Sequence, residues 1–425
     1  TVSVLYWLPA MSTPYVAPPL TVIAPNEPVS PSASSSADTA SQVAAADATL
    51  RPAPTHVRPK RGWLQWVPSD RQQLADTEAC LLHHLKHRYL QRFVAGINTV
   101  SSVVPTTAAA NNTSGQVAVP PGVAHRHVVL IHGFGGGLAM FMPNFDFLVA
   151  AAAKQREVIQ VHMIDMPGFA RSDRHPMVKF ANDREAMDYM CGHLREWFRA
   201  MGFDRPLRGT GANGPLPRVD LVGHSFGGYV TATFAGRYPD LVQRAVLCDP
   251  WGVPPKPEDD QRELPFKFRM ALHAFYIGNP FSVLRAAGPW GPTLLPSVRK
   301  DFADRWEPII GDPNIFFDYV FHCNASAHPT GEQAFQACCT GRIFAKRPLS
   351  SFVPKLPPRV GLGVIYGKRT WMDTDAGGAM VVEADRRRGP QSQNDLAFVD
   401  HAGHQVNTDN IEGFNQELAR MLNFA

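Results

Sequence analysis

Short runs of apolar residues recur between longer mixed segments through most of the chain after residue 127. Four such runs lie at residues 128–131, 158–164, 219–222 and 245–248. Because continuous apolar strands are typical of a parallel sheet with helices on both faces, the pattern predicts an α/β domain. The same rhythm returns at residues 359–366 and 396–399, and residues 411–422 are predicted to form a closing helix.

The alternation of predicted strands and helices stops between about residues 250 and 358, where Pro, Gly and aromatic residues are frequent. We interpret residues 252–354 as a cap inserted into one domain, whose core is formed by residues 96–251 and 355–425. Aromatic residues of the cap suit a lid over an acyl chain, although most of them are expected to form the core of the cap itself. They are Phe266, Phe268, Phe275, Tyr276, Phe281 and Trp290.

Residues 1–60 are rich in Pro, Ala and Ser and bury too little apolar surface to offset the entropy of ordering, so a disordered tail is predicted. A targeting segment is the alternative for this stretch. The first residues show no basic region followed by an apolar core, and the six cysteines include no Cys-x-x-Cys pair. We therefore expect an intracellular protein, either cytoplasmic or mitochondrial.

Residues 61–95 combine an aromatic pair with a predicted helix. Trp63 and Trp66 follow a basic pair at 60–61, and indole rings beside cations suit the interface of an anionic membrane. The alternative is that both rings fold back onto the domain. Ser69 is expected to cap a helix. The apolar positions of that helix are Leu74, Leu81, Leu82, Leu85 and Tyr89.

Composition excludes several classes of protein. A hydrophobic content of 44% over 425 residues rules out wholesale disorder. The formal charge of +4 is too small for a dedicated nucleic-acid-binding protein, so no nucleic-acid partner is expected. No stretch reaches the roughly 18 to 20 consecutive apolar residues of a transmembrane helix.

The strongest chemical motif is Gly-His-Ser-Phe-Gly at residues 223–227. It follows a predicted strand and precedes a predicted helix at 229–238, which is the context of a nucleophile elbow. In such an elbow a tight turn flanked by glycines exposes a strained serine. The motif therefore predicts Ser225 as a nucleophile.

A serine needs a base to remove its proton and an acid to orient that base, and both follow the serine in this fold. His404 lies in a glycine-containing loop after the last strand, and His401 is its nearest rival. His224 is expected to point away from the site. For the acid we choose Asp373 after the strand at 359–366, with Asp375 as the alternative.

The reaction also needs hydrogen-bond donors for the developing oxyanion. Phe226, directly after the nucleophile, is expected to supply one backbone N–H, and Phe134 in the loop after the first core strand the other. The glycines at 135–137 let that loop approach closely. A phosphate-binding loop is excluded, because neither Gly-Lys-Ser/Thr nor the G-x-G-x-x-G spacing is present. No metal or organic cofactor is expected.

Several further segments resemble one branch of the α/β-hydrolases. This branch contains the coactivator of adipose triglyceride lipase, the N-acyl-phosphatidylethanolamine lysophospholipase and the fungal cardiolipin deacylase. The resemblance covers about residues 62–422, except the loop at 205–217. It rests on the segments Gly-Trp-Leu-Gln-Trp at 62–66, His-Gly-Phe-Gly-Gly-Gly at 132–137, Asp-Pro-Trp-Gly at 249–252, Phe-His-Cys-Asn at 321–324 with Gly-Glu at 331–332, and 402–409 with Phe-Asn at 414–415.

The resemblance implies an α/β-hydrolase fold with a mostly parallel sheet and a mainly helical cap, and a triad of Ser225, Asp373 and His404. It also implies an acyltransferase motif, His-x4-Asp, formed by His404 and Asp409. The lipase coactivator has Asn at the nucleophile position, whereas this chain has Ser, which favours an active enzyme. Asp409 is expected to cap the last helix rather than take part in the chemistry.

We therefore predict a serine hydrolase of phospholipid or lysophospholipid esters that works at a membrane or lipid-droplet surface. A lysophosphatidate acyltransferase that uses the same acyl-enzyme is the first alternative, and a non-catalytic lipase coactivator is the second.

Overall fold

A computed structural model describes residues 69, 71–103, 125–175, 179–207, 210–258, 266–325 and 328–424. The predicted tail at 1–60 and the pair Trp63 and Trp66 lie outside these residues, as do the side chains of Phe266 and Phe268. Within the described part of the chain, no helix is both long enough and apolar enough to span a membrane.

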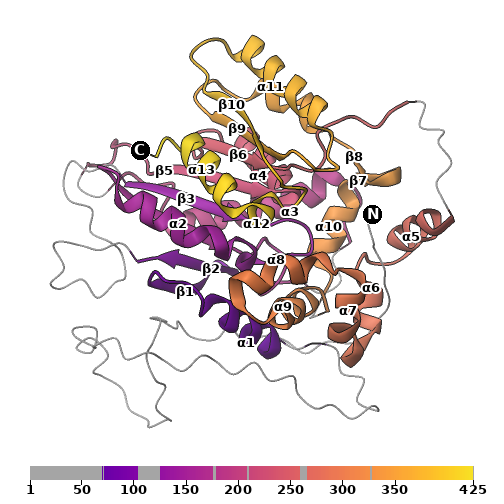
Figure 1. Cartoon of the computed structure of the whole chain (residues 1–425). Coiled ribbons are helices and arrows are strands. Elements are labelled where there is room, and N and C mark those ends of the chain that lie inside the picture. Colours follow the sequence, from indigo (N-terminus) through magenta and orange to yellow (C-terminus); the bar gives the residue numbers. More distant parts are fainter. Residues whose placement is uncertain are drawn as a thin grey trace, which may run out of the picture.

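In the described part of the chain, eight strands form the central sheet in the order β1-β2-β4-β3-β5-β6-β9-β10 (Figure 1). The pairs β1–β2 and β2–β4 are antiparallel, and all the others are parallel, which confirms the predicted mostly parallel sheet. The strands span Tyr89–Val94 (β1), Ile97–Ser102 (β2), His125–Ile131 (β3), Val158–Ile164 (β4), Arg218–His224 (β5), Arg244–Cys248 (β6), Gly361–Gly367 (β9) and Asn394–Val399 (β10).

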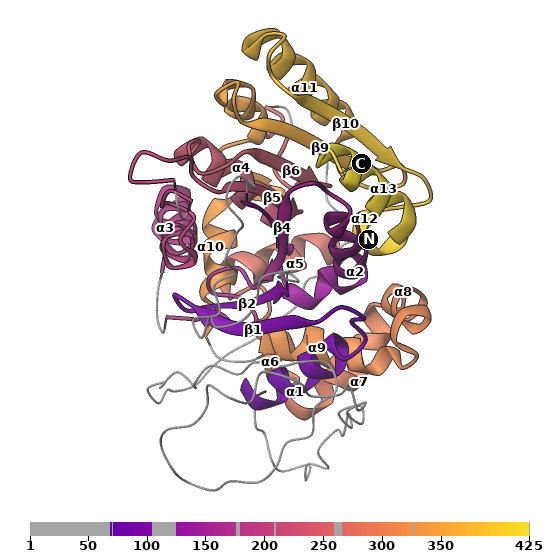
Figure 2. The same cartoon turned by 90° about the vertical axis from the view of Figure 1, so that its left-hand side faces the viewer.

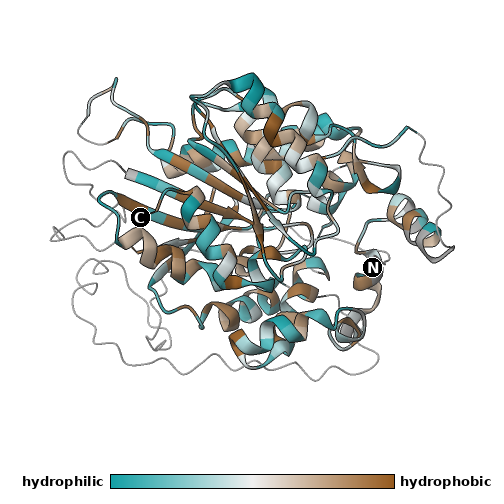
Figure 3. Ribbon diagram, turned by 45° about the horizontal axis from the view of Figure 1, so that its top comes forward, coloured by the Kyte–Doolittle hydropathy of each residue, from teal (hydrophilic) through white to brown (hydrophobic). Residues whose placement is uncertain are grey.

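Helices cover both faces of this sheet, as Figure 2 shows. One face carries α2 and α13, and the other carries α3, α4 and α11. The central strands are apolar on both sides and are mostly brown in Figure 3, whereas the helices are brown only in part. Continuous apolar strands thus bury both of their faces, as expected for parallel strands. These helices span Met142–Ala153 (α2), Asp183–Met201 (α3), Phe226–Arg237 (α4), Thr374–Arg388 (α11) and Ile411–Met421 (α13).

The predicted helix after Ser69 is shorter than expected, because α1 covers only Arg71–Leu82. Tyr89, assigned to that helix from its apolar spacing, instead begins strand β1. Ala95 and Gly96 turn the chain with φ angles of 47° and 77°, a two-residue hairpin turn that joins β1 to β2. The hairpin was missed because apolar spacing cannot show which distant strand will pair. Ser69 Oγ lies 2.6 Å from His322 Nδ1.

Helices dominate the chain between β6 and β9, and they gather beside the carboxyl ends of the strands (Figure 1). The most buried of them is α9, which packs against α1, α7 and α8. The helices span Phe266–Ile277 (α5), Ser282–Ala286 (α6), Gly291–Val298 (α7), Asp301–Ile310 (α8), Pro313–Ala325 (α9) and Thr330–Cys338 (α10), followed by the short strands Cys339–Thr340 (β7) and Phe344–Ala345 (β8). Helix α12, Val406–Asp409, lies between β10 and α13.

Candidate active site

Ser225 lies at the sharp turn between β5 and α4. Its φ and ψ angles of 53° and −116° fall in a region that a residue with a side chain rarely adopts. The turn packs so closely that a Cβ added at Gly227 would lie 2.3 Å from the carbonyl oxygen of His132. The spacing of the motif therefore has a steric cause, and the strained turn presents the Ser225 hydroxyl above the sheet.

His404 lies beside this hydroxyl, in the loop between β10 and α12. Its Nε2 atom is 3.1 Å from Ser225 Oγ, within reach for accepting the hydroxyl proton. Its Nδ1–H donates to Oδ2 of Asp249 over 2.6 Å. The side chain of Asp249 is fully buried, and that of His404 is 18% exposed. The structure thus aligns a hydroxyl, an imidazole and a carboxylate.

The carboxylate is not the one chosen from the sequence. Asp373 is exposed and caps α11, because its side chain accepts from the N–H of Ala376 over 2.8 Å. Asp249 instead occupies the acid position, directly after β6, where it also accepts from the Gly367 N–H and the Thr370 hydroxyl over 3.2 and 2.6 Å. The choice of Asp373 as the partner of His404 was therefore wrong. Asp375, the alternative, is exposed in the first turn of α11.

The two other histidines near the site have separate contacts. His401, the rival base, is exposed, and its Nδ1 accepts from Arg369 over 3.0 Å. We expected His224 to point away from the site, but its Nε2–H donates to the backbone carbonyl of His404 over 2.7 Å. Burial lowers the pKa of His224 to about 3, which keeps the ring neutral as it holds the His404 loop.

The loop after β3 brings backbone N–H groups towards the nucleophile. A Cβ added at Gly133 would lie 2.8 Å from Nδ1 of His224 and 3.1 Å from Cβ of Ser225, so a larger residue here would displace the side chains of the site. The N–H groups of Phe134 and Phe226 have no hydrogen-bond acceptor among the residues that the structure describes. Backbone N–H groups that have no internal acceptor and lie next to a nucleophile are the donors that an oxyanion hole requires.

Polar side chains from elsewhere hold this loop in place. Asn324 on α9 donates to the carbonyl of Gly135 over 2.7 Å. The buried Asp165, after β4, accepts from the N–H of Leu138 over 2.6 Å and from the side chain of Asn98 over 2.7 Å. Burial raises the pKa of Asp165, and these hydrogen bonds oppose the shift. The sequence of the segment at 321–324 suggests no role for it, and the contact of Asn324 with Gly135 supplies one.

Asp409, the acid of the His-x4-Asp pattern, accepts hydrogen bonds through both of its carboxylate oxygens. Its carboxylate accepts from the N–H of Gly403 over 2.7 Å and from the guanidinium of Arg305 on α8. The expectation that Asp409 caps the last helix is wrong, because Asn410 caps it by accepting from the N–H of Gly413. Asp409 therefore ties the loop that carries His404 to the helices above it.

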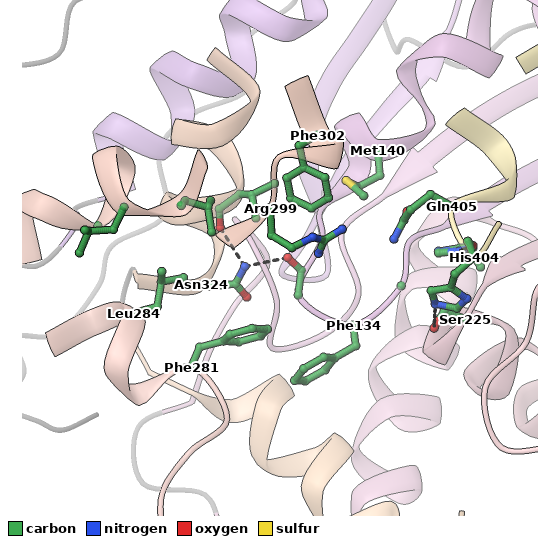
Figure 4. A pocket seen from close by; sticks show the side chains of 18 of the residues that line it. Phe134, Met140, Ser225, Phe281, Leu284, Arg299, Phe302, Asn324, His404 and Gln405 are labelled. Atoms are coloured by element: carbon green, nitrogen blue, oxygen red, sulfur yellow. Dashed lines mark hydrogen bonds between the residues drawn. The ribbon is translucent and has the colours of Figure 1, made fainter. Parts of the chain in front are cut away.

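A pocket of about 310 Å³ opens over Ser225 and His404. Figure 4 shows Phe134 and Phe281 below it, Met140 and Phe302 above, and Asn324 on the side opposite Ser225. Most of the lining is apolar, which suits an acyl chain, and its polar side chains lie both beside the serine and, at Arg299 and Asn324, further along the pocket. Phe281 and Phe302 both come from the stretch between β6 and β9, so residues of the helical segment contribute to the lining.

Asp249 is the residue that sequence reasoning missed. Its signal was present, because it directly follows the predicted strand at 245–248 and begins one of the segments on which the resemblance rests. The carboxyl ends of parallel strands meet at one edge, so an acid after either β6 or β9 can reach the same imidazole. Only the tertiary structure distinguishes the two.

Residues 126–284 match the family model described as the alpha/beta hydrolase fold. The chain is 31% identical to a (lyso)-N-acylphosphatidylethanolamine lipase from Mus musculus over 85% of this chain and 96% of the relative. It is also 31% identical to a 1-acylglycerol-3-phosphate O-acyltransferase from Homo sapiens over 68% of this chain and 76% of the relative. A solved esterase from Thermogutta terrifontis aligns with a TM-score of 0.46 and 19% identity over 79% of this chain and 98% of its own.

Proposed function

Because this chain belongs to the α/β-hydrolase family, in the branch that includes the (lyso)-N-acylphosphatidylethanolamine lipases, we propose that it hydrolyses acyl esters of phospholipids or lysophospholipids through an acyl-serine intermediate. The observation that carries this proposal is the line of hydrogen bonds from Ser225 through His404 to Asp249. The apolar pocket over the serine supports a lipid acyl group as the ligand.

In this mechanism His404 Nε2 takes the proton of Ser225 as Oγ attacks the ester carbonyl. Asp249 accepts the Nδ1–H of His404 and stabilises the imidazolium that forms. The N–H groups of Phe134 and Phe226 donate to the oxyanion. The tetrahedral intermediate then breaks its bond to the alcohol oxygen, which leaves with the proton from His404. Water, activated by His404 in the same way, releases the fatty acid from Ser225.

A second candidate activity uses the same acyl-enzyme with a lysophospholipid hydroxyl in place of water. The likeness to 1-acylglycerol-3-phosphate O-acyltransferases favours it. A role as a non-catalytic lipase coactivator is disfavoured by the serine at position 225, where the coactivator of this branch has Asn. We place the activity at the surface of a membrane or lipid droplet, a proposal that rests on Trp63 and Trp66 in the sequence.

A fluorophosphonate probe that acylates activated serines tests the proposal directly. We expect the wild-type protein to react with the probe and to release fatty acid from lysophospholipid, and the Ser225→Ala variant to do neither. Labelling that persists in Ser225→Ala would move the nucleophile elsewhere. An unlabelled, inactive wild type that melts cooperatively would favour the coactivator role instead.

A further inference from the structure

Among the described residues that line the pocket over Ser225, Arg299 is the one Lys, Arg, Asp or Glu. Arg299 lies between α7 and α8, and its guanidinium extends into the pocket below Phe302 and towards the side where Ser225 and His404 lie (Figure 4). Within the described part of the chain, no Asp or Glu contributes to the lining. One cation in a mostly apolar pocket favours a ligand with both a long apolar part and a negative charge.

The guanidinium is oriented before any ligand binds. Its Nε and Nη2 atoms donate to the two carboxylate oxygens of Asp301 over 2.9 and 2.8 Å, and its Cζ lies 3.7 Å from the centre of the Phe302 ring. Asp301 accepts in turn from Arg305, which also donates to Asp409. Because the fork is already fixed, little further side-chain entropy is lost when it binds an anion.

Donors remain available on the pocket side. A guanidinium carries five N–H groups, and Asp301 occupies one on Nε and one on Nη2. Nη1 has no acceptor among the residues that the structure describes, and the side chain of Arg299 is 35% exposed. The planar arrangement of the remaining donors matches two oxygens of a phosphate group, which an arginine binds in a bidentate manner.

We propose that Arg299 binds the phosphate group of the lipid substrate while the acyl ester lies at Ser225. This inference rests on the proposed function, because it concerns the substrate of the same site. In an esterified lipid the acyl carbonyl carries no formal charge, so the phosphate of a phospholipid or lysophospholipid is the anion that matches the arginine. Neutral mono-, di- and triacylglycerols lack this group and are bound without that contact.

A binding experiment separates this proposal from the question of catalysis. The probes are two ether lipids that cannot be hydrolysed, 1-alkylglycerol 3-phosphate and 1-alkylglycerol with the same chain, measured by calorimetry on the Ser225→Ala protein below their micelle concentrations. Adding Arg299→Gln is expected to weaken binding of the phosphate ether about 10- to 100-fold and to change binding of the neutral ether less than twofold. Lys300→Gln, which removes an exposed charge one residue away, is expected to change neither.

The opposite results are equally definite. The proposal would be overturned if Arg299→Gln weakened the binding of both ether lipids equally, or if it weakened the binding of neither. Arg299→Lys, which keeps the charge but loses the fork, should recover part of the phosphate preference even if Arg299→Gln unfolds. Inorganic phosphate at millimolar concentration should not displace the phosphate ether, and displacement would show a site for the free ion instead. If the phosphate preference holds while the wild type hydrolyses no ester, the binding site stands and the proposed hydrolysis fails.

Discussion

The hydroxyl of Thr370 donates a 2.6 Å hydrogen bond to Oδ2 of Asp249, the same oxygen that lies 2.6 Å from Nδ1 of His404. Thr370 lies in the loop after β9, and Asp249 lies directly after β6. The loop in which the sequence suggested an acid thus contributes a donor to an acid from the neighbouring strand. Two donors on one oxygen fix the orientation of the carboxylate towards the imidazole.

Replacing Asp249 by Asn should lower kcat for ester hydrolysis by about 10³- to 10⁴-fold, because the amide cannot stabilise the imidazolium of His404. Asp373→Asn serves as the matched control, and we expect it to retain activity within a few-fold with a slightly lower melting temperature, because Asn keeps the cap but removes a negative charge from the N-terminus of α11. Steady-state kinetics on a soluble short-chain ester measures both. If Asp373→Asn is the inactive variant, the acid assignment is wrong.

Thr370→Val should lower kcat about 3- to 10-fold, since it removes one of the donors that orient the Asp249 carboxylate towards His404. Thr370→Ser retains the hydroxyl and should recover most of the loss. The informative measurement is kcat with KM beside it, because a positioning role predicts a change in kcat alone. Equal activities of the Val and Ser variants would show that the Thr370 hydroxyl does not contribute to catalysis.

Asp409→Asn should reduce hydrolysis and any acyl transfer to lysophosphatidate by the same factor, about 10-fold. The physical reason is that Asp409 holds the backbone at Gly403, next to the base that both reactions share. Parallel assays with water and with a lysophosphatidate acceptor give the ratio of the two products. A selective loss of acyl transfer would instead assign Asp409 a direct role in that reaction.

Acidification should destabilise the fold before the carboxylates titrate. Burial lowers the pKa of His132 to about 4, while its Nε2 accepts from the N–H of Met166. Between the ordinary value near 6.5 and pH 4, the unfolded chain binds a proton that the folded chain does not, so stability falls as pH falls. For His132 this amounts to about 2 kcal/mol of unfolding free energy between pH 7 and pH 5.

His132→Gln should reduce this pH dependence, whatever its effect on stability at pH 7, because the amide does not titrate. The exposed His401→Gln is the matched control and should leave the dependence unchanged. Denaturant unfolding at pH 7 and pH 5 provides the comparison. An identical pH dependence in His132→Gln and the wild type would contradict the prediction.

Changing Trp63 and Trp66 together to Ala should weaken binding to anionic vesicles, because each ring removes apolar area from water at ~25 cal/mol per Å². Lys60 and Arg61 should add a salt-sensitive contribution on the order of 1 kcal/mol each. Vesicle sedimentation measures the binding, and hydrolysis of a soluble ester should stay nearly unchanged. Unchanged binding with a lowered melting temperature would show that the rings pack on the domain.

The sequence by itself determined the parallel core, the elbow and the base. Continuous apolar runs can bury both faces only between two layers of helices, which is what β3, β4, β5, β6 and β9 do. Ser225 was predictable because a tight strand-to-helix turn leaves a local steric signature in its glycines. A base in the loop after the last strand was predictable, since that loop must reach the edge where the elbow lies, and the resemblance chose His404 there over His401.

The tertiary structure decided what depends on contacts between distant segments. The spacing of apolar residues could not predict that β1 pairs with β2, so the helix before them ends earlier than expected. Nor could it predict that Asp249, and not Asp373, contacts His404. It also could not place Arg299 in the pocket, because a charged side chain between two helices is usually a solvated surface group. In each case the local pattern allowed two arrangements, and packing across the sheet selected one.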